Sequence, residues 1–406
     1  MESFKNAAVQ RFEETQAEKD WRKKEGFNDI EAKMPSLKTI RGSSSLLDNV
    51  TSYLGKNNPF THPVNSKEHS VWLFDNTAYQ AGEGQPWKAE VTAAYFQKGS
   101  GKDESKVVAN LAEVLGCAED EVAKETIAKR MQPLMDSIVP AHTCQIKLAG
   151  SQVVKLGPSD RDGISRNSVV FSDAHKDGQT ITSNAIGLES ATPLTTTFAD
   201  TTGWAVISDI DDTIKRTMTS SPLGILRTTF VEEPEPIAGM PELYKHIQSA
   251  LDTPPFWYLS ASPYNLYPFL RAFRESHYPP GTMILREASW MNLAGFLTSL
   301  TQGTEAYKVS RMETVQKAFP KRKFLLIGDS TQSDPEAYGD IARKYPGFVG
   351  AIFIRKVENV EPVNESEKNS PERFEKAFKD VPKNIWTIFE NPQELYAKID
   401  ALEKIA

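Results

Sequence analysis

The fold class of this chain is indicated most clearly by one stretch, Gly203-Trp204-Ala205-Val206-Ile207-Ser208-Asp209-Ile210-Asp211-Asp212-Thr213. Its apolar run ends in carboxylates at i and i+2, which is typical of a buried strand that delivers acidic groups to its own carboxyl end. Because residues two apart on an extended chain point to the same side, Asp209 and Asp211 are predicted to face one small volume. Ligands bind at this edge of an open α/β sheet. Two carboxylates this close need a cation or a shared proton, and Mg²⁺ prefers oxygen ligands.

Three further segments place a polar group where a predicted strand ends or a predicted helix begins. A hydroxyl at a strand end and the N-terminus of the next helix together suit an anion. A lysine at the start of a helix, and a second pair of carboxylates after another strand, complete the set. The three segments are Phe256-Trp257-Tyr258-Leu259-Ser260, Lys308 before the helical stretch 309–319, and Phe324-Leu325-Leu326-Ile327 followed by Gly328-Asp329-Ser330-Thr331-Gln332-Ser333-Asp334.

The order of these motifs resembles that of the haloacid-dehalogenase-like phosphohydrolases, whose motifs are D-x-D-x-T, a strand-end Ser or Thr, a Lys, and G-D-x-x-x-x-D. The resemblance implies an α/β Rossmannoid catalytic domain. Each motif is weak alone, but all four in this order are specific. An N-capping acidic turn, or the metal-nucleotide site of a glycosyltransferase, would explain the first motif but not the three downstream segments.

The same resemblance implies a role for each matched residue. Asp209 would be the nucleophile that forms an aspartyl-phosphate. Asp211 would protonate the leaving oxygen and then activate water. Ser260 and Lys308 would bind the phosphate oxygens. The implied Mg²⁺ ligands are Asp209, Asp329, Asp334 and a backbone carbonyl of Asp211.

Longer stretches around the motifs are similar to the catalytic domain of the fungal actin-patch phosphatidate phosphatase family. This resemblance covers most of residues 70 to 390, including 71–78, 208–217, 259–266 and 328–336. It implies Mg²⁺-dependent hydrolysis of phosphatidate, or of another phosphorylated lipid, at a transiently contacted membrane surface. The printed sequence ends without the proline-rich tract of some fungal relatives, so SH3 and actin-patch partners stay open.

Two other functions are compatible with the residues: a phosphatase of phosphoproteins or soluble phosphate esters, and a non-catalytic lipid-binding module. The intact acidic motifs disfavour the second. The gaps between the motifs are short and predict a site without a lid, which suits a bulky or interfacial substrate. Lys215 and Arg216, just beyond the nucleophile, are candidate substrate-binding residues that would meet an anionic surface.

Composition places the chain among ordinary soluble globular proteins, with 39% apolar and 25% charged residues among 406. The formal net charge of -7 argues against a nucleic-acid partner. Cys117 and Cys144 do not make a disulfide framework and fit a reducing compartment. No run of about 18 apolar residues exists, and the N-terminus lacks a signal-peptide core. We therefore expect a cytoplasmic protein that associates peripherally with membranes.

The chain is predicted to divide into three parts. Residues 1–60 form a peripheral helical or mobile segment, in which apolar residues at helical spacing over 46–54 can lie on a membrane surface or pack on the domain. Residues 61–200 contain short strand patterns with a helical insertion over 105–128 and predict a β-sandwich-like domain. Residues 201–406 form the haloacid-dehalogenase-like phosphatase domain.

Overall fold

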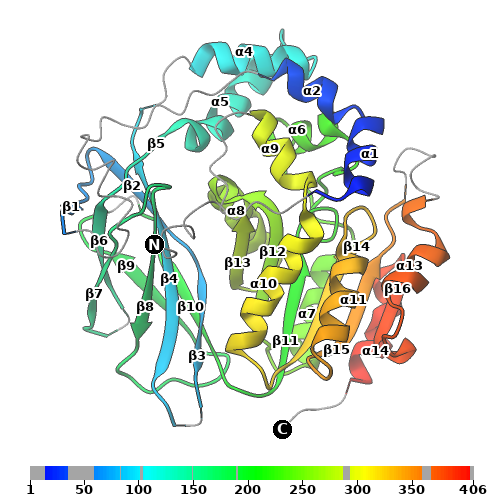
Figure 1. Ribbon diagram of the computed structural model, residues 1–406. Helices are drawn as coiled ribbons and strands as arrows, with labels where there is room; N and C mark the ends of the chain where they lie inside the picture. Colours follow the sequence, from blue (N-terminus) through cyan, green and yellow to red (C-terminus); the bar gives the residue numbers. More distant parts are fainter. Residues whose placement is uncertain are drawn as a thin grey trace, which may run out of the picture.

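The computed structural model describes residues 14–34, 59–82, 84–100, 104–148, 150–188, 191–286, 293–358 and 367–402. These residues form a mixed α/β protein (Figure 1). Among them, no helix is long and apolar enough to cross a membrane. The 46–54 stretch, for which the sequence allowed a membrane-surface helix, lies outside the described residues.

A parallel sheet forms the centre of the C-terminal part (Figure 1). Its strand order is β13-β12-β11-β14-β15-β16, and every neighbouring pair is parallel. The strands predicted to deliver Asp209 and Asp329 are confirmed, and the strand through Ser260 runs on to Pro263. The six strands are β11 (Trp204–Asp209), β12 (Phe256–Pro263), β13 (Gly281–Arg286), β14 (Lys323–Asp329), β15 (Val349–Arg355) and β16 (Trp386–Phe389).

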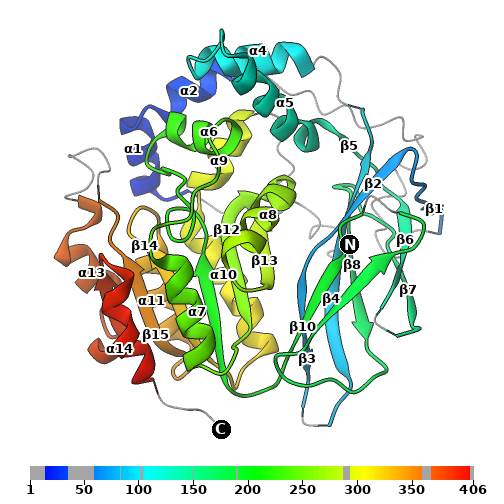
Figure 2. The ribbon, with the colours of Figure 1, turned by 180° about the vertical axis from the view of Figure 1, so that it is seen from behind.

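Helices cover both faces of this sheet. Alternate strand residues face opposite sides, so Val206 belongs to one buried core and Ala205 and Ile207 to the other. The helices α10 and α11 lie before the sheet in Figure 1, and α7 and α8 face the viewer in Figure 2. The helices of this part are α6 (Pro222–Phe230), α7 (Met240–Ala250), α8 (Tyr267–His277), α9 (Leu293–Thr301), α10 (Thr304–Ala318), α11 (Asp334–Lys344), α13 (Pro371–Ala377) and α14 (Tyr396–Asp400), with short 3₁₀ turns η2 (Tyr264–Leu266), η3 (Lys383–Ile385) and η4 (Pro392–Leu395).

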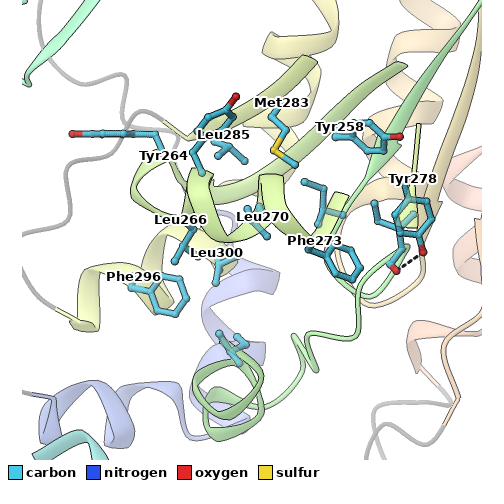
Figure 3. Close-up of a cluster of buried hydrophobic side chains, with 14 of the residues drawn as sticks. Tyr258, Tyr264, Leu266, Leu270, Phe273, Tyr278, Met283, Leu285, Phe296 and Leu300 are labelled. Carbon is cyan, nitrogen blue, oxygen red and sulfur yellow. Dashed lines mark hydrogen bonds between the residues drawn. The ribbon is translucent and has the colours of Figure 1, made fainter. Parts of the chain in front are cut away.

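The core between α8, α9 and the strands β12 and β13 is shown in Figure 3. Leu270 and Phe273 of α8 are buried there against apolar side chains of the sheet. Truncating a buried phenylalanine such as Phe273 to alanine costs about 3 to 5 kcal/mol. The Tyr278 hydroxyl, at the end of α8, donates to the carbonyl oxygen of Ile214 at 2.7 Å. This core therefore also anchors the loop that follows Asp211.

The described residues within 59–200 form a β-rich unit that also contains two helices. Its ten strands belong to one branched hydrogen-bonded network, in which the long strand β4 pairs with β2, β3, β5 and β8. The division of this unit into two stacked sheets stays a prediction, because hydrogen-bonded strand pairing connects all ten strands without a break. The elements are β1 (His62–Pro63), β2 (His69–Leu73), β3 (Asn76–Gln80), β4 (Trp87–Gln97), α4 (Glu104–Val114), α5 (Glu121–Met135), β5 (Ser137–Ile138), β6 (His142–Lys147), β7 (Val153–Leu156), β8 (Ile164–Val170), β9 (Thr180–Ala185) and β10 (Leu194–Ala199).

Buried ion pairs attach the β-rich unit to α8. The Asp75 carboxylate contacts Arg271 Nη2 at 3.2 Å and Arg274 Nη2 at 3.0 Å, and all three side chains are buried. The backbone N–H of Asp75 donates to the Tyr267 hydroxyl at 2.8 Å. Burial raises the pKa of Asp75, and the two guanidinium groups oppose that shift. Removing one partner of such a buried pair costs about 3 to 5 kcal/mol, so this contact fixes how the two parts meet.

The N-terminal helices α1 (Gln16–Lys24) and α2 (Phe27–Lys33) pack on the parallel-sheet part. Arg22 is buried and contacts Thr301 at the end of α9, and its guanidinium contacts Glu31 at 2.6 Å. Phe27 is fully buried in the core that includes α9. Residues 14–34 are therefore largely helical, as the sequence allowed, but they are packed into the folded unit, so the expectation of a mobile segment is wrong for them.

Candidate active site

Asp209 lies at the end of β11, where it is surrounded by a cluster of buried polar groups. Its Oδ1 atom lies 2.7 Å from Nζ of Lys308, which comes from the second turn of α10. The Thr213 hydroxyl lies 3.0 Å from Oδ2 of Asp209 and 3.2 Å from Oδ2 of Asp329. Thr213 therefore links the first and last motifs of the sequence, a contact that motif matching alone did not predict.

Three buried carboxylates form the acidic centre of the site. Oxygen atoms of Asp209, Asp329 and Asp334 all lie within 4.8 Å of one another. Asp334 also accepts a hydrogen bond from the backbone N–H of Asp329 at 3.1 Å, which fixes the loop between them. A Cβ atom at Gly328 would lie 2.6 Å from Oδ2 of Asp334, so the glycine of this motif is needed for close approach.

The charge of this centre suits a divalent cation. Lys308 contacts Asp209, Asp334 and the side-chain oxygen of Gln332, and it supplies one positive charge against three carboxylates. Burial alone would lower the pKa of Lys308, but the carboxylates raise it above its ordinary value. Burial and the neighbouring carboxylates raise the pKa of Asp329 to about 7, although Lys308 opposes the shift. Hard oxygen donors with excess negative charge are the set that Mg²⁺ prefers.

The Asp211 side chain points away from that centre into a group of hydroxyls. Its Oδ2 atom accepts from Ser260 at 2.6 Å and from Ser262 at 3.3 Å. Its Oδ1 atom accepts from Thr217 at 2.9 Å. Three of the predicted metal ligands, the carboxylates of Asp209, Asp329 and Asp334, therefore lie together. The Asp211 carboxylate instead contacts two serines and a threonine. Ser262, two residues after Ser260 on an extended chain, could have been found by the i, i+2 rule.

Asp212 organises the turn that carries these groups. It has φ of 60°, a left-handed conformation that a non-glycine residue rarely adopts. Its carboxylate accepts from the backbone N–H groups of Thr217, Met218 and Thr219 at 2.7 to 2.9 Å. Arg355 donates to its carbonyl oxygen at 2.7 Å. These contacts hold the strained turn and so position Thr217 beside Asp211.

Lys215 is not at the surface, so its predicted contact with an anionic surface is wrong. Its side chain is buried, and Nζ lies 3.1 Å from the hydroxyl of Thr217 and 5.6 Å from the ring centre of Phe269. Burial lowers the pKa of Lys215, while Asp211 and Asp212 oppose the shift. Lys215 therefore supports the threonine that contacts Asp211. Arg216 is exposed, as expected.

The site is more enclosed than the motif gaps predicted. Asp209, Asp211, Lys308 and Asp329 are all buried. The helices α1, α2, α4, α5, α6 and α9 gather beyond the carboxyl end of the sheet (Figures 1 and 2), where α5 contacts α6 and α2 contacts α9. The short gaps between the motifs did not predict that helices cover the site, because four of the six helices precede the first motif in the sequence.

Arg373 holds the loop that carries the last motif, and no motif in the sequence points to this residue. Its guanidinium donates to the carbonyl oxygens of Ser330 at 2.5 Å and Gln332 at 2.6 Å. It also contacts both oxygens of Glu336, at 2.8 and 2.9 Å. This bidentate geometry combines charge with direction and holds the loop between Asp329 and Asp334.

Comparison with known proteins finds similarity over part of the chain. Residues 204–356 match the family described as "Phosphatidate phosphatase APP1, catalytic domain". A Saccharomyces cerevisiae protein named phosphatidate phosphatase APP1 is 31% identical over 196 residues, which are 48% of this chain and 31% of that protein. An uncharacterized Schizosaccharomyces pombe protein is 30% identical over 163 residues, 39% of this chain and 26% of the relative.

These matches are partial, since the chain spans less than a third of the length of either relative. Among solved structures, a β-glucuronidase from Ruminococcus gnavus aligns with 79% of this chain and with 54% of its own chain, at 9% sequence identity. The TM-score of 0.19 is too low for this match to inform the fold. The family match, by contrast, begins at β11 and ends just after β15, and it includes every predicted site residue. Over residues 204–356, this chain is thus similar to the family of the phosphatidate phosphatase APP1 catalytic domain.

Proposed function

We propose that this chain is a Mg²⁺-dependent phosphatase that hydrolyses phosphatidate to diacylglycerol and phosphate. The observation that carries the proposal is the buried Asp209, with Lys308 at 2.7 Å and the carboxylates of Asp329 and Asp334 beside it. The lipid substrate rests on similarity to a relative that is named a phosphatidate phosphatase. The parallel strand order and the acidic carboxyl edge support a haloacid-dehalogenase-like Rossmannoid domain, and the β-rich unit is proposed to be sandwich-like.

In the first step, an oxygen of Asp209 attacks the phosphorus atom and forms an aspartyl-phosphate. The bond between phosphorus and the glycerol oxygen breaks, and Asp211 gives its proton to that oxygen, which leaves as the hydroxyl of diacylglycerol. The hydroxyls around Asp211 orient its carboxyl group toward the leaving oxygen. Lys308 and Ser260 would hold the nonbridging phosphate oxygens, as the resemblance implies.

In the second step, water attacks the phosphorus of the aspartyl-phosphate, and the bond to Asp209 breaks. Asp211, deprotonated by the first step, takes the proton of the attacking water. Inorganic phosphate leaves and both carboxyl groups return to their starting state. One aspartate thus forms the covalent bond, and the other moves the proton.

Asp209, Asp329 and Asp334 would hold the metal ion, because their oxygens converge and carry more charge than Lys308 balances. When bound, Mg²⁺ would offset the negative charge of the phosphoryl group and help to orient it. The Asp211 side chain contacts hydroxyls instead, which leaves it available for proton transfer.

The proposed membrane-facing surface is the loop after Asp212. Met218 in this loop and Leu223 at the start of α6 are 40% and 38% exposed, and Arg216 is exposed in the same loop. Two apolar side chains and a cation next to the site suit transient contact with an anionic lipid surface. Arg216 also lies 3.4 Å from Glu235 and 3.8 Å from Glu232, so the apolar pair carries most of this argument.

The test is release of phosphate from phosphatidate in mixed micelles, run beside a soluble phosphate ester and a phosphopeptide, with and without Mg²⁺. The Asp209→Asn variant is the control for contaminating phosphatases. We expect Mg²⁺-dependent turnover of phosphatidate above the other two substrates. Preferred turnover of the phosphopeptide or the soluble ester would replace the lipid assignment.

A further inference from the structure

We propose that Glu18, in the N-terminal helix α1, is a positioning residue for Lys308. The inference concerns α10, whose second turn carries Lys308, and it rests on the proposed phosphatase function. Glu18 lies outside the family-matched residues 204–356, and nothing in the motifs points to it.

The helix α10 begins without a capping side chain of its own. Its N-cap residue is Gly303, with φ of 58°. The first N–H groups of any helix lack partners within the helix. Here Glu18 accepts hydrogen bonds from the backbone N–H groups of Gly303 and Thr304, both at 3.1 Å. A carboxylate at this end of a helix also interacts favourably with the helix dipole.

The capped turn leads directly to the catalytic groups. Thr304 and Lys308 are separated by four residues and so lie on the same face of α10. The Thr304 hydroxyl lies 3.3 Å from Oε1 of Glu18 and 2.6 Å from the hydroxyl of Ser333. Ser333 immediately precedes Asp334, which contacts Lys308. Through Thr304, Glu18 therefore reaches both partners of this buried ion pair.

Glu18 is itself held in place before it meets α10. It forms the capping box of α1, because Thr15 N–H donates to Oε2 of Glu18 at 2.8 Å and Glu18 N–H donates to the Thr15 hydroxyl at 3.2 Å. One turn later, buried Arg22 anchors the helix through Thr301 and Glu31. The carboxylate thus meets α10 with a fixed orientation, as a positioning group must.

The test compares Glu18→Ala and Glu18→Gln with Asp20→Ala, which removes an exposed acid from the same helix. We expect Glu18→Ala to lower kcat by about 10-fold, because a displaced catalytic group loses rate, while KM changes less than about twofold. Glu18→Gln keeps one acceptor oxygen and should recover part of the rate, and Asp20→Ala should match the wild type. Unchanged kcat in a folded Glu18→Ala protein would overturn the proposal.

A second measurement separates positioning from general destabilisation. Amide hydrogen exchange at Gly303, Thr304 and the following residues of α10 should quicken in both Glu18 variants, while exchange in β14 stays slow. If Glu18→Ala does not fold, Glu18→Gln provides the test and should show both a partial loss of kcat and faster amide exchange in α10. A Glu18→Gln protein without these two effects would refute the proposed positioning role of Glu18. A wild type inactive on every phosphate ester would instead refute the proposed function, and the exchange data would still decide whether Glu18 caps α10.

Discussion

The Nζ atom of Lys308 lies 2.7 Å from Oδ1 of Asp209, and the two side chains are 0% and 1% exposed. A charged pair this deeply buried is costly unless both partners are satisfied. Lys308 meets this requirement by contacting Asp334 and Gln332 as well. The lysine therefore holds Asp209 and the last motif in one geometry.

Replacing Asp209 by Asn or Glu should abolish turnover, because the attacking oxygen is lost or displaced by about one bond length. The fold should persist, since β11 is buried by its apolar residues. Phosphate release and a thermal melt measure both effects. A beryllium fluoride adduct trapped on wild-type Asp209 would support the covalent step, and appreciable turnover by Asp209→Asn would refute it.

Asp211→Asn should lower kcat by about 10²- to 10⁴-fold, the usual contribution of a positioned acid-base group. Affinity for Mg²⁺ should survive, because the Asp211 carboxylate contacts hydroxyls rather than the acidic centre. Calorimetric titration with Mg²⁺ measures this. Collapse of metal affinity in the variant would show that Asp211 has been given the wrong role.

Lys308→Met should destabilise the protein in the absence of metal by about 3 to 5 kcal/mol, because it leaves buried carboxylates uncompensated. Mg²⁺ should then raise the Tm more in the variant than in the wild type, since the ion replaces the lost positive charge. Thermal melts with Mg²⁺ and with EDTA make the comparison. Equal Mg²⁺ shifts in both proteins would argue against a metal site at these carboxylates.

Glu305, beside the capped end of α10, should make stability fall as the pH rises. Burial, together with the carboxylates of Asp340, Glu336 and Glu18, raises the pKa of Glu305 to about 7. A folded pKa above the unfolded value means that the contribution is complete below about pH 4.5 and is lost as the pH passes about 7. Glu305→Gln should flatten this loss. Because Glu305 is only half-buried, the effect should stay below about 1 kcal/mol, which urea melts at several pH values can measure.

Replacing Met218 and Leu223 by serine should weaken activity on phosphatidate vesicles more than on a short-chain soluble substrate. The exposed loop would then contribute less apolar contact to the membrane, while the buried site is unchanged. Val122→Ser, which changes an exposed apolar residue of α5, serves as the control. Equal losses on both substrates would place the loop in the catalytic machinery instead.

The local features of the site could be predicted from the sequence. The strands that end at Asp209 and Asp329 are short and apolar, and each is followed at once by its acidic residues, so no distant contact was needed to find them. The i, i+2 spacing predicted one direction for Asp209 and Asp211, but their carboxylates have different partners. The Asp211 carboxylate contacts the hydroxyls of serines and a threonine, whereas Asp209 contacts Lys308 and the Thr213 hydroxyl, and both sets depend on tertiary contacts.

The features that could not be predicted all depend on residues distant in sequence. Glu18 meets Gly303 across 285 positions, and Arg373 reaches back to the loop at Ser330. Lys215 has the sequence surroundings of a surface lysine, yet the packing of Phe269 and Thr217 encloses it. The charge of a lysine does not show whether its side chain is buried, because a buried ammonium group is tolerated when nearby oxygen atoms accept hydrogen bonds from it.

The edge of the parallel sheet limits where this protein can be divided. The strand β16 pairs with β15 but lies beyond residue 356, where the family match ends. A protein trimmed to the matched residues would leave the backbone groups of β15 without this partner, and such open edges invite self-association. It would also lack Arg373 and Glu18. The family-matched segment is therefore not self-contained, and a protein built from it would need both flanking segments as well.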